Sequence, residues 1–508
     1  MGPWLERNGP RKAGLLGATL FLIGNLVTAI GIHVKYISLV YLGYGIFGGL
    51  GLGISYISPV SALQKWFPDR RGVAAGLAVS GFGAGSIVMA KVPDPLSAAV
   101  GLPITFVILG CFYFAVMVAC AFVFRIPPPG YVVNGLDVWA RRVYDVDDAS
   151  NAETGSRTET EQAALPRISI DDGSNSPVSP VSPVSATLTM VPSAPLSINT
   201  SRRGSTISAE QVSYDPSLSM SLMDAFQSRE FRLMYIMLLA NTMAGVVIIS
   251  RLANITSDIF GYTKSDASTI VSINGGFNLV GRLAFASLSD RIGRKNSYLI
   301  MLGSQVVIIA SLPVIMKTGT NWAFLMAIWI LTSCYGGGFG CIPAFLCDMF
   351  GPSNVGPLHG VILTSWSLSS VGAGLLFTAV YNNLLQSGSF TVHDSYIYSV
   401  NLKWILVSVV FGLCITLFVR TGIRDRLLPN VQGELFHIRI FGRIARFGRF
   451  GMRWMTMEEE QQAWAVYVVQ RQLEDDQGDD LHYVGGIVSE KERILDGEKT
   501  SHYAEQSY

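Results

Sequence analysis

The chain has 508 residues and a formal net charge of +1, and only 14% of its residues are charged while half are hydrophobic. Soluble domains carry about 25% charged residues, so this balance excludes an ordinary soluble protein and indicates a chain largely embedded in lipid. The near-zero net charge gives no reason to expect a nucleic-acid partner.

Ten segments contain the roughly 20 mostly apolar residues that a helix needs to cross a bilayer. They fall into a block of four and a block of six and are expected at residues 13–33, 37–62, 73–92, 103–125, 231–250, 269–289, 297–316, 323–347, 359–381 and 402–422. The sequence therefore predicts an all-α multi-pass membrane protein, with an N-terminal bundle at 1–125 and a C-terminal bundle at 231–422.

Residues 126–230, between the two blocks, read as a disordered loop. The stretch "SPVSPVSPVS" and its Ser/Thr/Pro/Asp-rich surroundings contain too little apolar surface to fold. Its Ser-Pro repeats and the motif "RRGS" are typical of kinase substrates, which makes a kinase a candidate partner; an unregulated spacer is the alternative. The candidate phosphorylation sites are Ser176, Ser179, Ser182 and Ser205.

The tail, residues 423–508, begins with a basic segment at 436–455. Arginines recur there every three or four residues, with phenylalanine and isoleucine between them. This spacing predicts an amphipathic helix lying on anionic lipid, with a partner-binding site as the alternative. The acidic, polar residues that follow are expected to be disordered.

Lysine and arginine gather in the short loops on one side of the predicted spans, and the central loop and the tail lie on that side too. Basic loops face the cytoplasm, so this side is predicted to be cytoplasmic, in the plasma membrane or an internal membrane. Asn254, in the sequon "NIT", then faces outward as a candidate glycosylation site; an unused sequon is the alternative.

The two blocks repeat one another at a constant offset. Glu6 aligns with Asp290, Arg7 with Arg291, Gly9 with Gly293 and Arg11 with Lys295, and the later pairs include Pro59 with Pro343 and Gly76 with Gly360. Two spans precede the second hairpin, whereas none precedes the first. The repeat therefore predicts twelve spans in two halves, of which this chain carries ten, and an N-terminal truncation that removes the first two.

The hairpin sequences "ASLSDRIGRK" and "GPWLERNGPRK" resemble the paired motif of the major facilitator superfamily. The resemblance implies two pseudo-symmetric six-helix bundles and a gating role for the hairpins, in which a carboxylate beside a helix N-terminus and arginines forms bonds that break as the halves move. The gating residues it implies are Glu6, Arg7, Gly9, Arg11, Asp290, Arg291, Gly293, Arg294 and Lys295.

A narrower resemblance comes from "WFPDRRGVAAGLAVSGFGAG" and "NLVGRLAFASLSDRIGR". These stretches are similar to the oxalate/formate antiporter family, which is related to the monocarboxylate transporters. The resemblance implies an antiporter-like membrane transporter of small carboxylates.

Glycines four residues apart lie on one face of a helix and let two backbones approach closely. Such faces are predicted at two places, as sliding or static packing surfaces. They comprise Gly45, Gly49 and Gly53 on one span and Gly81 and Gly85 on another.

Arg282 is the leading candidate for substrate binding, because a charged residue inside a span is costly and its fork of donors suits a carboxylate. An arginine reaching to the interface is the alternative. The resemblance places it at the family's substrate arginine. Asn278 lies one turn earlier, where monocarboxylate transporters have an aspartate, and Trp366 stands where oxalate transporters have a lysine. Tyr56, Asn241 and Asn274 complete the predicted lining.

These departures favour a monoanion over oxalate and, with no carboxylate deep in any span, exchange or uniport over proton coupling. His359 is expected at the membrane interface. A non-transporting sensor or scaffold that signals through the loop and tail is the alternative function. No nucleophile–base pair, phosphate loop or Cys/His cluster appears, so no enzyme activity, cofactor or metal is expected.

Overall fold

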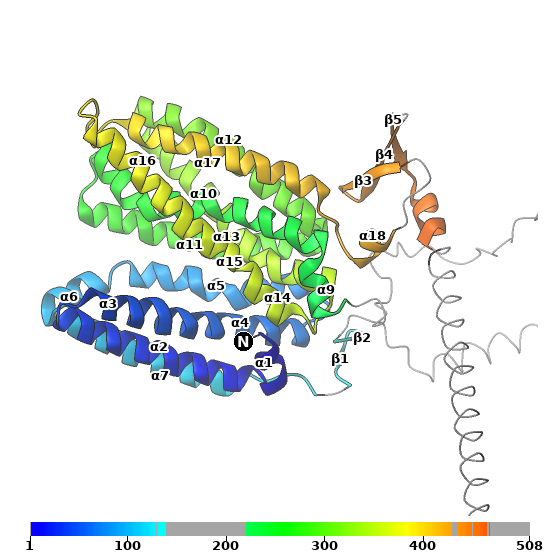
Figure 1. Cartoon of the computed structure of the whole chain (residues 1–508), viewed down its shortest axis with the longest axis horizontal. Helices are drawn as coiled ribbons and strands as arrows, with labels where there is room; N and C mark the ends of the chain where they lie inside the picture. Colours follow the sequence, from blue (N-terminus) through cyan, green and yellow to red (C-terminus); the bar gives the residue numbers. More distant parts are fainter. Residues whose placement is uncertain are drawn as a thin grey trace, which may run out of the picture.

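The computed structural model describes residues 2–128, 130–138, 220–428, 434–449, 451–464 and 467. Its long helices form two bundles that lie side by side along their lengths (Figure 1). The four predicted phosphorylation sites lie outside the described residues. The architecture confirms the predicted all-α multi-pass class.

The first bundle contains four long antiparallel helical segments. In chain order its elements are α1 (Gly2–Asn8), α2 (Pro10–His33), α3 (Ile37–Val40), the π-helical segment η1 (Tyr41–Gly48), α4 (Gly49–Trp66), α5 (Arg71–Met89), α6 (Pro93–Val100) and α7 (Leu102–Val123). The segments α3, η1 and α4 follow one another without a break as a single span.

The second bundle contains six long segments. Its elements are α9 (Leu222–Gln227), α10 (Arg229–Phe260), α11 (Lys264–Ile292), α12 (Arg294–Thr318), α13 (Asn321–Phe350), α14 (Val355–Ile362), α15 (Thr364–Leu368), the π-helical segment η3 (Ser369–Ala373), α16 (Gly374–Gln386) and α17 (Ser395–Phe418). The elements α14 to α16 form one span.

Nine helical segments of the described residues are long and apolar enough to cross a membrane. The one predicted span that is missing from these nine, residues 269–289, corresponds to α11, which is 29 residues long. Its apolar run is interrupted by Asn274, Asn278 and Arg282, and this lowers its hydropathy. Polar residues are tolerated there because α11 packs against α5 of the first bundle and α13 of the second.

Two glycines turn the chain at equivalent places in the two halves. Gly9 separates α1 from α2 with φ 82°, and Gly293 separates α11 from α12 with φ 90°. Residues with a Cβ avoid this backbone region, so glycine permits both corners. The end of the bundles at which Gly9 and Gly293 lie is called the hairpin end below.

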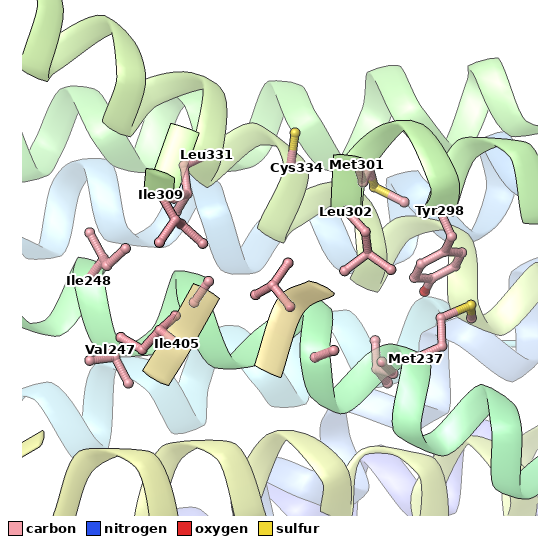
Figure 2. Close-up of a cluster of buried hydrophobic side chains, with 14 of the residues drawn as sticks. Met237, Val247, Ile248, Tyr298, Met301, Leu302, Ile309, Leu331, Cys334 and Ile405 are labelled. Atoms are coloured by element: carbon pink, nitrogen blue, oxygen red, sulfur yellow. The ribbon is translucent and has the colours of Figure 1, made fainter. Parts of the chain in front are cut away.

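The larger hydrophobic core lies inside the second bundle. Figure 2 shows Ile248 of α10, Ile309 of α12, Leu331 of α13 and Ile405 of α17 gathered in one part of this core. Smaller clusters occupy the first bundle and the contact between the bundles. The second bundle is therefore the more extensively packed of the two.

The predicted packing role of Gly45, Gly49, Gly53, Gly81 and Gly85 is wrong for the described residues. A Cβ added at any of them would meet no atom within 4 Å. The close approach is instead made by neighbouring glycines: a Cβ at Gly43 would lie 2.7 Å from the Gly24 carbonyl oxygen. The π-helical segment η1 changes the number of residues per turn, which shifts the packed face away from the one that regular α-helical spacing predicts.

The segment predicted to be a disordered loop, 126–230, contains ordered elements at both ends. Strands β1 (Val132–Val133) and β2 (Leu136–Asp137) form a hairpin around Asn134 and Gly135, whose φ angles of 51° and 75° suit a tight primed turn. At the other end of the loop, Ser221 precedes α9 and caps it, because the Ser221 hydroxyl accepts a hydrogen bond from the Asp224 N–H.

The tail segment 436–455 is not the predicted helix. It forms an antiparallel sheet of β3 (Glu434–Ile440), β4 (Arg443–Gly448) and β5 (Gly451–Met455), in the order β3-β4-β5. Phe441 and Gly442 both have positive φ and form the tight turn between β3 and β4. Ile438, Arg439 and Ile440 alternate along β3, so the period of two prevails over the spacing of three or four.

Asn254 lies inside α10 rather than in the predicted outer loop. The helix continues to Phe260 and ends at Gly261, which adopts a left-handed conformation. Glycosylation sequons are used in surface loops. The helical position of Asn254 therefore removes the structural basis for predicting a glycan there.

The tail sheet is held by a hydrogen bond to the hairpin end and by polar contacts to residues 420–425, which follow α17. The Phe441 N–H donates to Asn296 Oδ1 at 3.2 Å, which links the β3–β4 turn to the first turn of α12. Arg439 pairs with the buried carboxylate of Asp425 at 3.2 Å. His437 contacts both Glu434 and Arg420.

Two titratable groups that join β3 to residues 420–425 have lowered pKa values. Burial raises the pKa of Asp425, but Arg439, the Thr421 N–H, Arg420 and His437 outweigh it, so the net direction is downward. Burial and Arg420 lower the pKa of His437 more than Asp425 and Glu434 raise it. Each group therefore stabilises the docked sheet at neutral pH and loses that contribution as the pH falls.

We predict that acidification undocks the tail sheet. The His437 contribution should begin to fall below about pH 6.5, the unperturbed value, and the Asp425 contribution below about pH 4. Hydrogen–deuterium exchange of the β3 and β4 amides, corrected for intrinsic rates, should show less protection at pH 5.5 than at pH 7.5. His437→Asn should abolish this difference, and pH-independent protection in the unaltered protein would contradict the prediction.

Candidate functional site

Arg282 is buried where the two bundles meet. Its side chain is 1% exposed. The guanidinium donates from Nε to Asn278 Oδ1 at 2.8 Å, and from Nη1 to the Val79 carbonyl oxygen at 3.0 Å and the Tyr56 hydroxyl at 3.4 Å. Arg282 and Asn278 belong to α11, whereas Tyr56 and Val79 belong to α4 and α5, so the guanidinium joins the two bundles.

Aromatic rings cover the guanidinium from both bundles. Its central carbon lies 5.1 Å from the Phe82 ring centroid and 4.9 Å from that of Phe339. Trp366 packs edge-on against both phenylalanines, at 5.7 Å and 5.3 Å between centroids. The three rings form an apolar wall, and Phe82 and Phe339 offer the cation the negative faces of their π-systems. The sequence prediction missed both phenylalanines, because an aromatic residue in a span has no distinguishing pattern.

Close backbone contacts hold α11 in this position. A Cβ at Gly83 of α5 would lie 2.7 Å from the Leu279 nitrogen, and one at Gly76 would lie 3.0 Å from the Arg282 carbonyl oxygen. On the opposite side, Gly340 of α13 also lies against the Arg282 carbonyl. Residues with side chains at these positions would push α11 away, so the glycines set the depth and rotation of Arg282.

Two of the six predicted lining residues lie apart from the guanidinium. Asn274 Oδ1 accepts from the Thr332 hydroxyl at 2.8 Å, which ties α11 to α13. Asn241 donates to the Cys334 carbonyl oxygen at 3.4 Å inside the second bundle. The structure therefore brings together Arg282, Asn278, Tyr56 and Trp366, and assigns Asn274 and Asn241 to helix packing.

No carboxylate pairs with Arg282 among the described residues. The guanidinium bonds to an amide, a hydroxyl and a carbonyl, all neutral, and its Nη2 has no hydrogen-bond partner in the described part of the chain. A buried cation without an anionic partner carries a large desolvation cost. The arrangement can therefore bind an anion through the remaining donor and the uncompensated charge.

The span prediction also missed Arg251, because the segment was ended at residue 250. Arg251 Nη2 donates to the Thr378 hydroxyl at 2.7 Å, and its guanidinium lies 5.2 Å from the Phe377 ring centroid. These contacts join α10 to α16 within the second bundle and involve none of the residues that touch Arg282.

The second predicted hairpin motif bridges the bundles. Asp290, at the end of α11, accepts 3.0 Å hydrogen bonds from the backbone N–H groups of Gly72 and Val73 in the first turn of α5. Arg294 pairs with Asp290 at 2.6 Å and with Asp348 of α13 at 2.9 Å. A carboxylate at a helix N-terminus is stabilised by the helix dipole and the free N–H groups.

The first hairpin motif makes its bonds within its own bundle. Glu6 accepts from the Ser61 hydroxyl at 2.7 Å and pairs with Lys65 at 2.5 Å, both on α4. It only packs against the second bundle, where a Cβ at Gly356 of α14 would lie 2.7 Å from Glu6 Oε1. The two hairpins, although repeated in sequence, therefore connect the bundles differently.

The other predicted gating residues have separate roles. Arg11 places its guanidinium 4.5 Å from the Phe122 ring centroid in α7. Lys295 Nζ donates to the Leu417 carbonyl oxygen at 2.6 Å, near the end of α17. Arg7 and Arg291 are exposed. Lys295 therefore ties its hairpin to a helix of its own bundle, as Arg11 does in the first.

Comparison with known proteins identifies a family and two carboxylate-handling relatives. The Major Facilitator Superfamily profile matches residues 1–374. The chain is 24% identical over 405 residues to Apicoplast pyruvate carrier 1 of Toxoplasma gondii, covering 76% of this chain and 67% of the relative. It is 22% identical over 391 residues to the Oxalate:formate antiporter of Oxalobacter formigenes, covering 77% and 74%.

Among solved structures, a double-tryptophan mutant of XylE covers 82% of each chain with a TM-score of 0.51. Its sequence is 14% identical to this chain, so the likeness shows the fold alone.

We predict that Asp290→Asn opens the hairpin end. Hydrogen bonds to a charged group contribute about 1.5–3 kcal/mol, so losing the charge should favour separation of α5 from α11 by about tenfold or more. Cys347 is buried beside Asp348 and can report this opening. The rate at which a thiol reagent labels Cys347, followed by peptide mass spectrometry, should rise by a similar factor in Asp290→Asn.

The matched control is Asp266→Asn, at the other end of α11, where the carboxylate only bonds the Thr263 hydroxyl. This control should leave Cys347 labelling unchanged. Equal labelling rates in Asp290→Asn and the unaltered protein would contradict the prediction.

Proposed function

The chain belongs to the Major Facilitator Superfamily and is a membrane transporter, and we propose that it moves small carboxylate anions, monocarboxylates in particular, by alternating access. The observation that carries the proposal is the guanidinium of Arg282, buried between two bundles with neutral partners and no carboxylate among the described residues. A planar carboxylate fits the donor geometry of such a fork.

The surroundings of Arg282 favour a small monoanion. One uncompensated cation balances one negative charge, and a second carboxylate on the substrate would lie against Phe82, Phe339 and Trp366. Burying an unpaired charge against apolar rings is unfavourable. The two relatives, a pyruvate carrier and an oxalate:formate antiporter, support a carboxylate substrate.

The contacts at the hairpin end support alternating access. Asp290 closes this end by capping α5, and Arg282 lies two turns away on the same helix, about 12 Å along its axis. Breaking the Asp290 cap would let α5 and α11 separate and admit solvent to Arg282 from this end. The positively charged loops indicate that the hairpin end faces the cytoplasm, with the central loop and tail on the same side.

One observation favours the alternative of a membrane sensor or scaffold. The tail sheet contacts the hairpin directly through Phe441 and Asn296, next to Lys295. A sensor would use this contact to report a ligand bound at Arg282 without moving it. Flux and binding separate the two functions: a transporter exchanges labelled carboxylate across the membrane, whereas a sensor binds it without flux.

We predict that the full chain, reconstituted in liposomes, exchanges labelled formate, lactate or pyruvate faster than oxalate. Arg282→Gln should reduce this exchange at least tenfold, because it removes a charge-assisted bond to the substrate. The control is Arg251→Gln, which removes an arginine of the same bundle that lies outside the site and should retain exchange. Equal exchange in Arg282→Gln and the unaltered protein would overturn the carboxylate assignment.

A further inference from the structure

His359 is a fully buried histidine at the contact between the two bundles. Its side chain is 0% exposed, in contrast to the interfacial position expected from the sequence. The imidazole lies 5.9 Å from the Tyr56 ring, centroid to centroid, with the planes inclined at 45°. His359 belongs to α14 and Tyr56 to α4, so the pair spans the two bundles one ring away from Arg282.

Neither ring nitrogen of His359 has a hydrogen-bond partner among the described residues. An imidazole always has at least one N–H to donate, and leaving a buried polar group unpaired costs about 1–3 kcal/mol. Four carboxylates on elements packed against α14 are engaged elsewhere: Glu6 with Lys65, Asp348 with Arg294, Asp224 with Ser221 and Asp258 with Tyr398. This environment therefore accommodates a neutral ring and not a charged one.

The other titratable groups on these elements include Glu230, which is half-buried in the first turn of α10. Tyr56 of α4 is the titratable side chain whose ring meets the imidazole, and its hydroxyl accepts from Arg282. Tyr235 of α10 pairs with the Thr364 hydroxyl at 3.0 Å. The charged residues that begin α10 are Arg229, Glu230 and Arg232, of which the two arginines are exposed.

The contact that buries His359 is one that alternating access must break. α14 packs against α1 and α4 of the first bundle. When the hairpin end opens, these helices separate from α14, and the imidazole passes from a dry contact into water. A hydrated histidine binds protons near neutral pH, whereas a dry one without an acceptor does not. The same motion that exposes Arg282 therefore changes the proton affinity of His359.

We propose that His359 carries a proton that crosses the membrane with the substrate anion, an inference that rests on the proposed carboxylate transport. In the open conformation, a proton from water binds the free ring nitrogen and a carboxylate binds Arg282. On closure the anion at Arg282 offsets the charge of the desolvated imidazolium, and on the far side the anion leaves Arg282 and the imidazolium returns its proton to water. Transport in the other direction reverses these steps, so one anion and one proton cross together.

This proposal changes the transport mode inferred from the sequence. Exchange or uniport was expected because the spans contain no deep carboxylate and Asn278 replaces an aspartate beside Arg282. The structure places the ring of a histidine beside Tyr56, whose hydroxyl accepts from Arg282, and an imidazole can carry a proton where an asparagine cannot.

Proteoliposomes containing the full chain test the proposal through two separate activities. A pH gradient of one unit, with the acidic side outside, should drive about tenfold accumulation of a labelled monocarboxylate if one proton accompanies each anion. Exchange of labelled for unlabelled substrate at equal pH needs no net proton movement. His359→Gln should therefore lose the gradient-driven accumulation and keep the exchange.

The control is His393→Gln, which makes the same substitution at a histidine that bonds the Asp258 carbonyl oxygen outside this contact. It should retain both activities. Gradient-driven accumulation by His359→Gln, or exchange without accumulation by the unaltered protein, would overturn the proton role and leave the carboxylate assignment intact. Loss of both activities in His359→Gln would assign the residue a structural role and likewise overturn the proposal. Absence of any carboxylate flux in the unaltered protein would reject both proposals.

Discussion

The organisation of the molecule depends on a guanidinium that bridges two bundles through neutral groups. Arg282 bonds Asn278 in its own helix and Val79 and Tyr56 in the other bundle. A carboxylate partner would compensate the charge and fix the pair, whereas amide, hydroxyl and carbonyl oxygens stabilise the cation only in part. The contact between the bundles therefore contains a partly compensated positive charge, which the proposed anionic substrate would neutralise.

The hairpin end and the anion site are parts of one helix. Asp290 caps α5 at the end of α11, and Arg282 lies two turns from it on the same helix. A helix transmits displacement at one turn to the next, so separation of the Asp290 cap moves the guanidinium relative to Val79. The first hairpin lacks this connection, because Glu6 bonds Ser61 and Lys65 of its own bundle. The two hairpins are therefore similar in sequence, but only the second one forms hydrogen bonds between the bundles.

The sequence predicts the parts of this arrangement that depend on local spacing. The ten apolar segments follow from the length that a helix needs to cross a bilayer, and the place of Asn278 one turn from Arg282 follows from helical periodicity. The paired hairpins follow from the internal repeat and the resemblance that it carries. In the structure, Arg282 donates a hydrogen bond to Asn278, and Asp290 accepts a hydrogen bond from the first turn of α5. Residues that act through their own helix, or through its end, were therefore accessible to prediction.

The predictions that failed depend on which face of an element meets another. Gly45 and Gly81 have the spacing of a packing face but lie on faces without neighbours, and the π-helical segment η1 leaves no clear mark in the sequence. The burial of His359 arises from α4 and α1, which are distant in the chain. The tail strands satisfy helical and extended periods at once, and only the turn at Phe441 and Gly442 decides between them.

Arg282, Tyr56 and His359 together explain why such a contact can both close and reopen. With the ring neutral and no anion bound, the interface holds one cation that neutral oxygens and aromatic faces partly stabilise. An anion alone neutralises it, while a proton alone adds a second cation near the first, which opposes closure by like-charge repulsion. Anion and proton together restore the charge of the empty state. In the proposed cycle, closure is therefore electrostatically similar for the empty interface and for the fully loaded one, and this equivalence would couple the two ligands without any direct bond between Arg282 and His359.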